Sequence, residues 1–117
     1  MKALICAFAL LSFTLSAWAA HPFKVEDMQR LSRVAGPRVS PDGKWVAFTV
    51  VRSDVEKNKM VTNIWRVPAA GGDPQQITFA EQGFNGDLRW SPDGRYLYFV
   101  STRVENKRQI FRLSVQG

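Results

Sequence analysis

The sequence predicts an all-β fold, an incomplete β-propeller of about two blades of four antiparallel strands, preceded by a signal peptide and a short helix. Three observations predict it. The tetrapeptide Ser-Pro-Asp-Gly occurs twice, at residues 40–43 and 91–94, which places the copies 51 residues apart. Each copy precedes a run of aromatic and β-branched residues, which favour strands. Short strand-like segments recur around each copy in units of about 40 to 50 residues, the spacing of propeller blades.

The internal repeat extends beyond the tetrapeptide. Residues 38–52 and 89–103 share seven of fifteen residues, namely the arginine at each end, the four turn residues and one phenylalanine. Proline at the second turn position presets φ for a type I turn, and glycine at the fourth adopts the left-handed conformation at little steric cost. Such a turn joins antiparallel strands. One copy would indicate only a turn, whereas two copies that open similar strands indicate a repeated unit.

The first residues have the features of a secretory signal peptide, which we predict at residues 1–19. Lys2 supplies a positive charge, residues 3–15 form an apolar run, and the Ala-Trp-Ala that follows fits a small-x-small cleavage site. The run is too short to span a bilayer comfortably, although an uncleaved membrane anchor is the alternative. We therefore expect an exported protein, periplasmic or secreted, with no stable membrane span after cleavage.

The composition allows one small domain core, since 45 % of the 117 residues are hydrophobic. The single cysteine, Cys6, lies in the predicted signal peptide, so the mature chain needs no disulfide. The net charge of +6 could indicate binding to nucleic acid or an anionic membrane. Export argues against nucleic acid as a partner, and the scattered basic residues are typical of a solvated surface.

Residues 20–37 are predicted to form a helical lead-in. Within residues 23–34, Val25, Met28 and Leu31 recur at the spacing of one helix face. Acidic residues come early in this segment and basic residues late, which suits the helix dipole. We expect a short amphipathic helix docked by its apolar face, with a membrane-surface helix as the alternative. The Ala-Gly-Pro that follows ends it.

Residues 38–117 are assigned to the first blades, of which the second is incomplete. Strands are expected at residues 44–51, 60–67, 75–79, 95–102 and 109–115, with short lead-ins at 38–39 and 88–90 and loops at 52–59 and 81–87. The strand after each turn is apolar on both faces, so it should be buried on both sides by neighbouring sheets. Because propellers close with roughly four to eight blades, two cannot close a ring. The chain is therefore expected to be the front end of something longer.

A family resemblance becomes specific at the turns and at the residues before them. Residues 39–48 and 90–99 look like the blade repeats of TolB-type, WD-repeat-like propellers. Residues 26–31 and 34–43 resemble the start of bacterial prolyl oligopeptidase family serine peptidases, in particular the acylaminoacyl-peptidase and dipeptidyl-peptidase-like members. Further similarity to the first two blades of that family lies in residues 63–68, 71–72, 101–103 and 109–111.

The resemblance implies that the parent protein is an exported serine peptidase. In that family an N-terminal propeller gates access to a C-terminal α/β-hydrolase domain, which carries the catalytic Ser, Asp and His. That domain is missing from this chain, and the peptide substrate and the hydrolase domain are the expected partners. The chain contains no G-x-S-x-G, and its one histidine, His21, is expected to be an exposed terminal residue. The alternative is a non-enzymatic periplasmic propeller that binds protein partners, as TolB-type propellers do.

The sequence predicts no catalytic residue, cofactor or metal site in this chain. It has no His, Cys and Asp cluster with metal-ligand spacing and no phosphate-binding loop. Asp42 and Asp93 each precede a glycine, but the further carboxylates of a calcium loop are missing. Both aspartates are interpreted as turn residues.

Overall fold

The computed structural model describes residues 22–115, so the predicted signal peptide and His21 lie outside the described residues. The elements in chain order are α1 (Val25–Arg30), β1 (Arg33–Val39), β2 (Trp45–Asp54), β3 (Lys59–Pro68), β4 (Gln75–Gln76), β5 (Asn85–Trp90), β6 (Tyr96–Val104) and β7 (Lys107–Ser114). The predicted all-β fold is confirmed.

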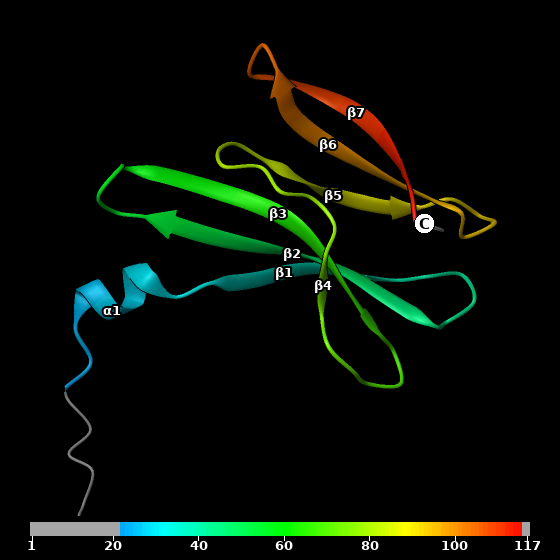
Figure 1. The fold of residues 1–117 in the computed structure, drawn as a ribbon, viewed down its shortest axis with the longest axis horizontal. Helices are drawn as coiled ribbons and strands as arrows, with labels where there is room; N and C mark the ends of the chain where they lie inside the picture. The colour runs from blue at the N-terminus through cyan, green and yellow to red at the C-terminus, as the bar shows by residue number, and fades with distance from the viewer. Residues whose placement is uncertain (1–21, 116–117) are drawn as a thin grey trace, which may run out of the picture.

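The strands form two antiparallel sheets, which we call blade 1 and blade 2 (Figure 1). Blade 1 has the order β1-β2-β3-β4, and blade 2 has the order β5-β6-β7. Blade 1 is thus a complete four-stranded unit, and blade 2 has three strands within the described part of the chain. This matches the expected open arrangement of two repeated units.

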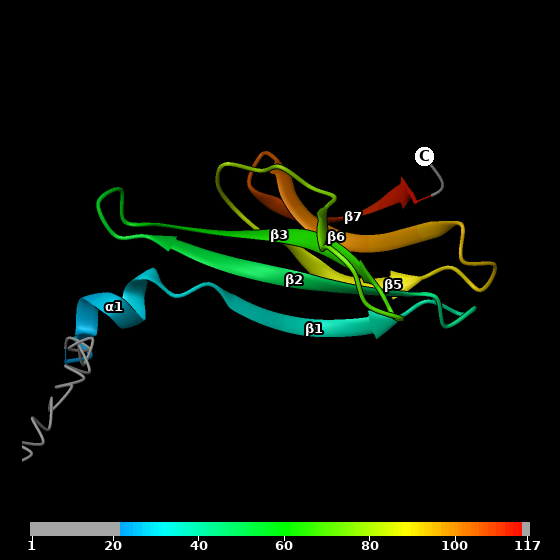
Figure 2. The ribbon, with the colours of Figure 1, turned by 60° about the horizontal axis from the view of Figure 1, so that its bottom comes forward.

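The two blades lie close together at β5 and move apart toward their outer strands. β5 contacts β1, β2 and β3, whereas within residues 22–115 the outer strands β4 and β7 make no contact with each other. Figures 1 and 2 show the second sheet lying along the first, with β5 nearest to it. Radial divergence of successive sheets is the geometry of a propeller.

The core lies between the blades, on the side where they converge. Its buried residues come from both sheets and are Ala47, Ile64, Leu88, Leu97 and Phe99. Partly buried Ile77, Trp90, Phe111, Leu113 and Val115 pack around them. Apolar area removed from water between the sheets therefore holds the two units together.

The register of each sheet defines two faces. We call the face of a blade that points toward the next blade its forward face, and the opposite one its backward face. In blade 1, Ala47 pairs with Arg66 and Thr49 with Ile64, and these four residues lie on the forward face. The backward face of blade 2, which covers them, is built from Leu97, Phe99, Phe111 and Leu113.

Burial of the strand after the first turn is complete on one side only. Ala47 and Thr49 on the forward face of blade 1 are buried, as expected. On the backward face Val50 is also buried, but Val46 and Phe48 keep intermediate exposure. Two-sided burial was expected, and the difference arises because no sheet within residues 22–115 covers the backward face of blade 1.

The helix in the structure is shorter than the one expected within residues 23–34. α1 ends at Arg30, and the residues from Arg33 onward form β1, which pairs Ala35 with Thr49 across to β2. A bulge follows Ala35, where Gly36 has φ +59. The helical pattern was read from local spacing, but ladder hydrogen bonds to β2 satisfy the backbone of this segment over a longer stretch. Likewise, β5 begins at Asn85, inside the expected loop, and β4 covers only the start of its expected range.

The expected docking of the helix by its apolar face is wrong. No residue of α1 is buried, and Val25 and Met28 are 64 % and 58 % exposed. The polar residues Glu26, Gln29 and Arg30 instead line a hollow with the end of β2. The helix lies beyond the start of β1 (Figure 1), where blade 2 does not reach it.

The first Ser-Pro-Asp-Gly turn is held by a compact set of hydrogen bonds. The Ser40 hydroxyl donates to the Asp42 carboxylate at 2.5 Å and accepts from the Trp45 backbone N–H at 3.0 Å. The same carboxylate accepts from the Lys44 N–H at 3.0 Å. Ser40 and Asp42 are therefore fully engaged in shaping the corner, which supports their interpretation as turn residues.

The second turn repeats these contacts at the same distances. Ser91 donates to Asp93 at 2.5 Å, and the N–H groups of Tyr96 and Arg95 donate to Ser91 and Asp93 at 3.0 Å. The glycine of each turn has φ +72, a conformation that L side chains rarely adopt. The sequence repeat is thus a structural repeat at the level of single hydrogen bonds.

These hydrogen bonds make the stability of the two turns depend on pH. Donation by the Ser40 hydroxyl, reinforced by the Lys44 N–H, lowers the pKa of Asp42 from its ordinary value of 3.8, and Ser91 and Arg95 lower the pKa of Asp93 likewise. A carboxyl whose folded pKa is depressed stabilises the fold above its unfolded pKa. That stabilisation is lost as the pH falls through the folded pKa.

We predict that the double variant Asp42→Asn/Asp93→Asn loses less stability on acidification below about pH 4 than the unmodified chain, because the amides cannot be protonated there. Urea unfolding over a pH series measures this. Ser40→Ala/Ser91→Ala keeps both carboxylates but removes their strongest hydrogen bond, so it should flatten the same pH profile. An unchanged acid dependence in both double variants would contradict the role given to the turns.

Candidate functional site between the blades

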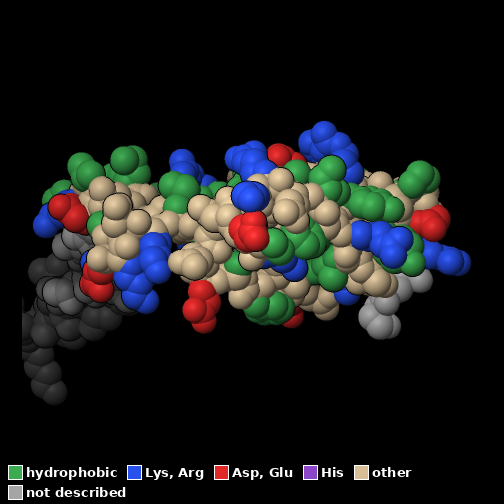
Figure 3. All heavy atoms as spheres, turned by 90° about the horizontal axis from the view of Figure 1, so that it is seen from above, with side chains coloured by type: hydrophobic (Ala, Val, Ile, Leu, Met, Phe, Trp, Pro, Cys, Tyr) green, Lys and Arg blue, Asp and Glu red, His purple; other side chains and the backbone are tan. Residues whose placement is uncertain are grey.

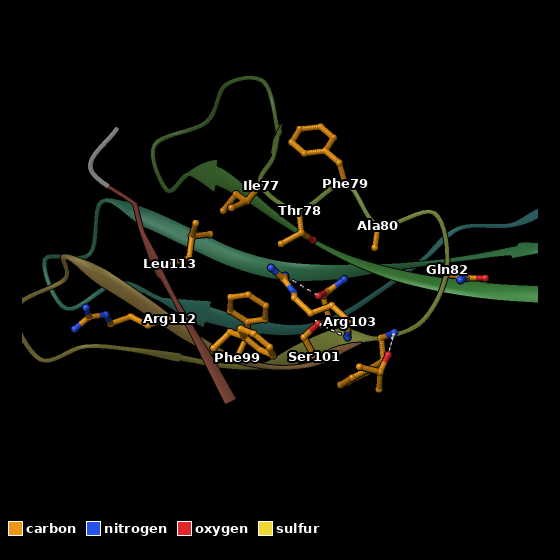
Figure 4. Close-up of a pocket in the computed structure, with 14 residues that line it drawn as sticks. Ile77, Thr78, Phe79, Ala80, Gln82, Phe99, Ser101, Arg103, Arg112 and Leu113 are labelled. Carbon is orange, nitrogen blue, oxygen red and sulfur yellow. Dashed lines mark hydrogen bonds between the residues drawn. The ribbon is translucent and has the colours of Figure 1, made fainter. Parts of the chain in front are cut away.

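A cavity of about 430 Å³ opens between the diverging blades. The segment after β4, residues 77–84, lines one side, and β6 and β7 line the other (Figure 4). Phe99, Phe111 and Leu113 supply apolar surface, while Ser101 and Arg103 supply polar groups. The cavity is therefore a mixed groove on the outer side of the core.

The charged side chain of Arg103 lies in this groove and is held by hydrogen bonds to other residues that line it (Figure 4). Its guanidinium lies 4.8 Å from the ring centroid of Phe111 and 5.1 Å from that of Phe99. Its Nε donates to Ser101 Oγ at 3.0 Å, and its Nη2 donates to Asn85 Oδ1 at 3.1 Å. The cation is thus stacked on two rings and fixed by two neutral acceptors, an arrangement that suits the planar fork of arginine.

The same contact occurs in blade 1. Arg52, which corresponds to Arg103 in the repeat, lies 5.9 Å from the ring centroid of Trp65, which corresponds to Phe111. A contact that recurs in both units is best explained by the architecture of the blade, and it needs no ligand. The two arginines marked the ends of the sequence repeat, but nothing in the local sequence showed that they stack on aromatic rings.

A second arginine–aromatic pair also recurs. Arg66 lies 4.3 Å from the ring centroid of Trp45 in blade 1, and Arg112 lies 4.4 Å from that of Tyr96 in blade 2. Arg66 also reaches the other blade, where its Nη1 donates to the backbone carbonyl of Val115 at 2.9 Å. This arginine therefore joins the two blades as well as bracing its own.

Further hydrogen bonds fix the blades to each other. The indole N–H of Trp90 donates to the Arg38 carbonyl at 3.0 Å, and the Asn85 amide donates to the Thr62 carbonyl at 3.3 Å. Within the described residues, no buried side-chain nitrogen or oxygen lacks a hydrogen-bond partner. The contact between blades is consequently specific in register as well as apolar.

The described part of the chain offers no catalytic constellation. Ser101 accepts hydrogen bonds from Arg103, and His21 lies outside the described residues, so no serine there faces a histidine. Among residues 22–115, no group of three or more His, Cys, Asp or Glu side chains could hold a metal ion. No helix in that range is long and apolar enough to cross a membrane. On the face shown in Figure 3, basic side chains are dispersed among apolar and acidic ones.

Comparison with known sequences finds proteins named as peptidases among the relatives of this chain. No protein-family model matches the sequence. The uncharacterized peptidase YuxL of Bacillus subtilis is 33 % identical over 92 residues, which are 79 % of this chain and 14 % of the relative. The chain is thus similar in sequence to a protein named as a peptidase. Dipeptidyl-peptidase 5 of Porphyromonas gingivalis is 35 % identical over 71 residues, which are 61 % of this chain and 10 % of the relative.

Solved structures share the fold of this chain. The apo AtxE2 isopeptidase has a TM-score of 0.69 at 21 % identity, over 82 % of this chain and 19 % of that one. The acylaminoacyl peptidase of Pyrococcus horikoshii has a TM-score of 0.62 at 21 % identity, over 76 % and 13 %. A putative TolB from Agrobacterium tumefaciens has a TM-score of 0.52 at 34 % identity, over 74 % and 28 %.

Together these comparisons confirm the expected resemblance to prolyl oligopeptidase family peptidases with TolB-type blades. The chain spans only 14 % and 10 % of the lengths of the two sequence relatives, so their activities belong to much longer proteins. At 21 % identity, the two peptidase structures show a shared fold alone.

We predict that Arg103→Met lowers the free energy of unfolding by about 1 kcal/mol, because it keeps the apolar stem but removes the stacked cation and its two hydrogen bonds. Urea unfolding measures the difference. Arg33→Met makes the same chemical change at an arginine of β1 that stacks on no aromatic ring within residues 22–115, so it should change stability much less. Arg103→Lys keeps the charge but loses the planar fork, so full recovery by lysine would contradict the stacked geometry as the cause.

Proposed function

We propose that this chain forms the first blades of a propeller that gates the entry of peptides to a serine peptidase domain in an exported protein. The observation that carries the proposal is the combination of two stacked propeller blades with sequence similarity to two proteins named as peptidases. Residues 22–115 contain no catalytic constellation of their own, which favours a structural part in such an enzyme.

The physical basis for gating is the rigidity of the stacked sheets. The blades converge where β5 meets β1 and are braced in register by hydrogen bonds and by Arg66. A ring built from such sheets encloses a central channel of fixed width. A flexible peptide could pass such a channel, whereas a folded protein would be excluded by its size.

Export is supported by the sequence of the N-terminus. The positive start, the apolar run and the small-x-small motif of residues 1–19 are those of a signal peptide. N-terminal sequencing of protein recovered outside the cytoplasm should find a chain that begins at Ala20 or His21. Protein found only in the cytoplasm, with a chain that still begins at Met1, would contradict the proposed export.

We predict that the protein translated from the complete reading frame hydrolyses short peptides and spares folded proteins. It should be labelled by a serine-directed phosphonate probe at a serine within G-x-S-x-G. The 117-residue chain, assayed in parallel as the control, should neither be labelled nor hydrolyse any peptide. Turnover by the short chain alone, or a reading frame without a nucleophile serine followed by Asp and His, would overturn the peptidase proposal.

A second candidate function is a propeller that binds protein partners without catalysis. The observation in its favour is the 34 % identity to a putative TolB, which exceeds the identity to the two peptidase structures. The phosphonate probe separates the two candidates. A binding propeller would contain further blades but no labelled serine.

A further inference from the structure

One segment connects the two blades along the chain, and we call it the crossover. It comprises residues 77–84 and runs from β4, the outer strand of blade 1, to β5, the strand of blade 2 that contacts blade 1 (Figure 1). Connecting segments are usually the more mobile parts of a fold. The hydrogen bonds of the crossover instead fix it to both blades.

The first half of the crossover is held by Asn63, a buried residue of β3. Its Oδ1 accepts hydrogen bonds from the Thr78 hydroxyl at 2.8 Å and from the Ala80 N–H at 2.9 Å, and its Nδ2 donates to the Ala80 carbonyl at 2.9 Å. The Thr78 hydroxyl also accepts from the Ile64 N–H at 2.9 Å. If this half moved away from β3, it would leave buried polar groups without partners, which is costly.

The second half of the crossover is bonded to both blades through adjacent residues. The Gly83 carbonyl accepts a hydrogen bond from the Thr62 N–H of β3 at 3.0 Å. The Phe84 N–H donates to Thr102 Oγ1 of β6 at 3.0 Å, and the Phe84 carbonyl accepts from the Thr102 N–H at 3.1 Å. Hydrogen bonding therefore continues from blade 1 through the crossover to blade 2.

Gly83 permits this close approach. It has φ +87, and a Cβ atom built on it would lie 2.7 Å from Thr102 Oγ1, closer than real Cβ contacts. Glycine alone meets both requirements, because it has no side chain and adopts positive φ readily. A side chain at this position would displace the Thr102 hydroxyl that Phe84 binds.

The contact surface between the two blades, which we call the seam, is also filled by the core. Ile64 of blade 1 and Leu97 of blade 2 have no exposed surface. Buried Phe99 belongs both to this core and to the lining of the groove on the outer side. A peptide could therefore pass between blades 1 and 2 only by parting the core and breaking the hydrogen bonds of the crossover.

We propose that this seam is a permanently closed part of the propeller wall, so that peptides reach the peptidase domain through another opening. The inference rests on the gating function proposed above. Opening the seam would break the three hydrogen bonds of Asn63 and the three that bond Gly83 and Phe84 to the blades. It would also expose the apolar area of the core to water. The size limit on substrates is therefore maintained at this place by residues that touch no substrate.

Hydrogen–deuterium exchange of the protein translated from the complete reading frame tests the closure without any variant and without an activity assay. The backbone amides of Ala80, Phe84 and Thr102 should exchange as slowly as those in the middle of β6, because only unfolding of both blades releases them. Exchange in the crossover that is about 100-fold faster than in β6 would show local opening of the seam and overturn the proposal.

Two glycine variants then test what holds the crossover. Gly83→Ala should speed amide exchange of the crossover at least about tenfold, since the new methyl group displaces Thr102. Gly71→Ala is the matched control, because Gly71 has φ +103 but no atom within 4 Å of its added Cβ, and it should leave the crossover unchanged. Asn63→Ala loosens the first half and should also speed exchange. Unchanged exchange in both Gly83→Ala and Asn63→Ala would overturn the proposal.

A peptidase assay of the same proteins tests the consequence for gating. Gly83→Ala should raise the hydrolysis of a small folded protein several-fold while kcat/KM for a short peptide stays unchanged, and Gly71→Ala should match the unmodified protein. Equal acceleration of the short peptide would show that peptides normally enter at the seam, and an unchanged size preference despite faster exchange would show that the seam sets no size limit. Either result overturns the proposal.

Failure of the proposed function gives a different result. An unmodified protein that hydrolyses no peptide would refute the peptidase activity, whereas slow exchange of the crossover in that protein would still show that the seam is closed.

Discussion

Ile64 and Leu97 have no exposed surface because the sheet of blade 2 lies directly on that of blade 1. Both sheets carry apolar residues on the faces that meet, and burying these faces against each other removes their apolar area from water. The contact between blades is therefore the interaction on which the remaining structure depends. It places the core, fixes the divergence of the outer strands and leaves the groove between them.

Arginine side chains fix the position of one blade against the other in this apolar contact. Arg66 and Arg103 stack on aromatic rings of their own blades and use their remaining donors on specific acceptors, one of them across the interface. Planar guanidinium groups can satisfy both requirements at once, whereas an ammonium group would act only as a point charge. Because each stacked pair recurs in the other blade, the arginines belong to the repeated unit as much as the turns do.

The architecture also bears on function. Relatives named as peptidases are far longer than this chain, and the described residues hold blades without a catalytic constellation. The groove beside Arg103 lies where the two sheets diverge, and the side chains of Arg103, Ser101 and Asn85 in it already have hydrogen-bond partners inside the protein. The features that distinguish this chain are accordingly surfaces for stacking sheets.

The sequence by itself determined the elements that local chemistry controls. The two Ser-Pro-Asp-Gly turns, the strands that follow them and the three-stranded second unit were predicted, because turn geometry depends on the backbone preferences of four adjacent residues. Three features were not predicted. They are the stacking of Arg103, the acceptor of Arg66, and the strand that begins at Arg33, where a helix was expected. Each depends on a partner far along the chain, and Met28 is exposed because α1 turns its polar residues, not its apolar ones, toward the end of β2. Only the tertiary structure decides such contacts, since strand pairing and sheet stacking join residues that a local pattern cannot relate.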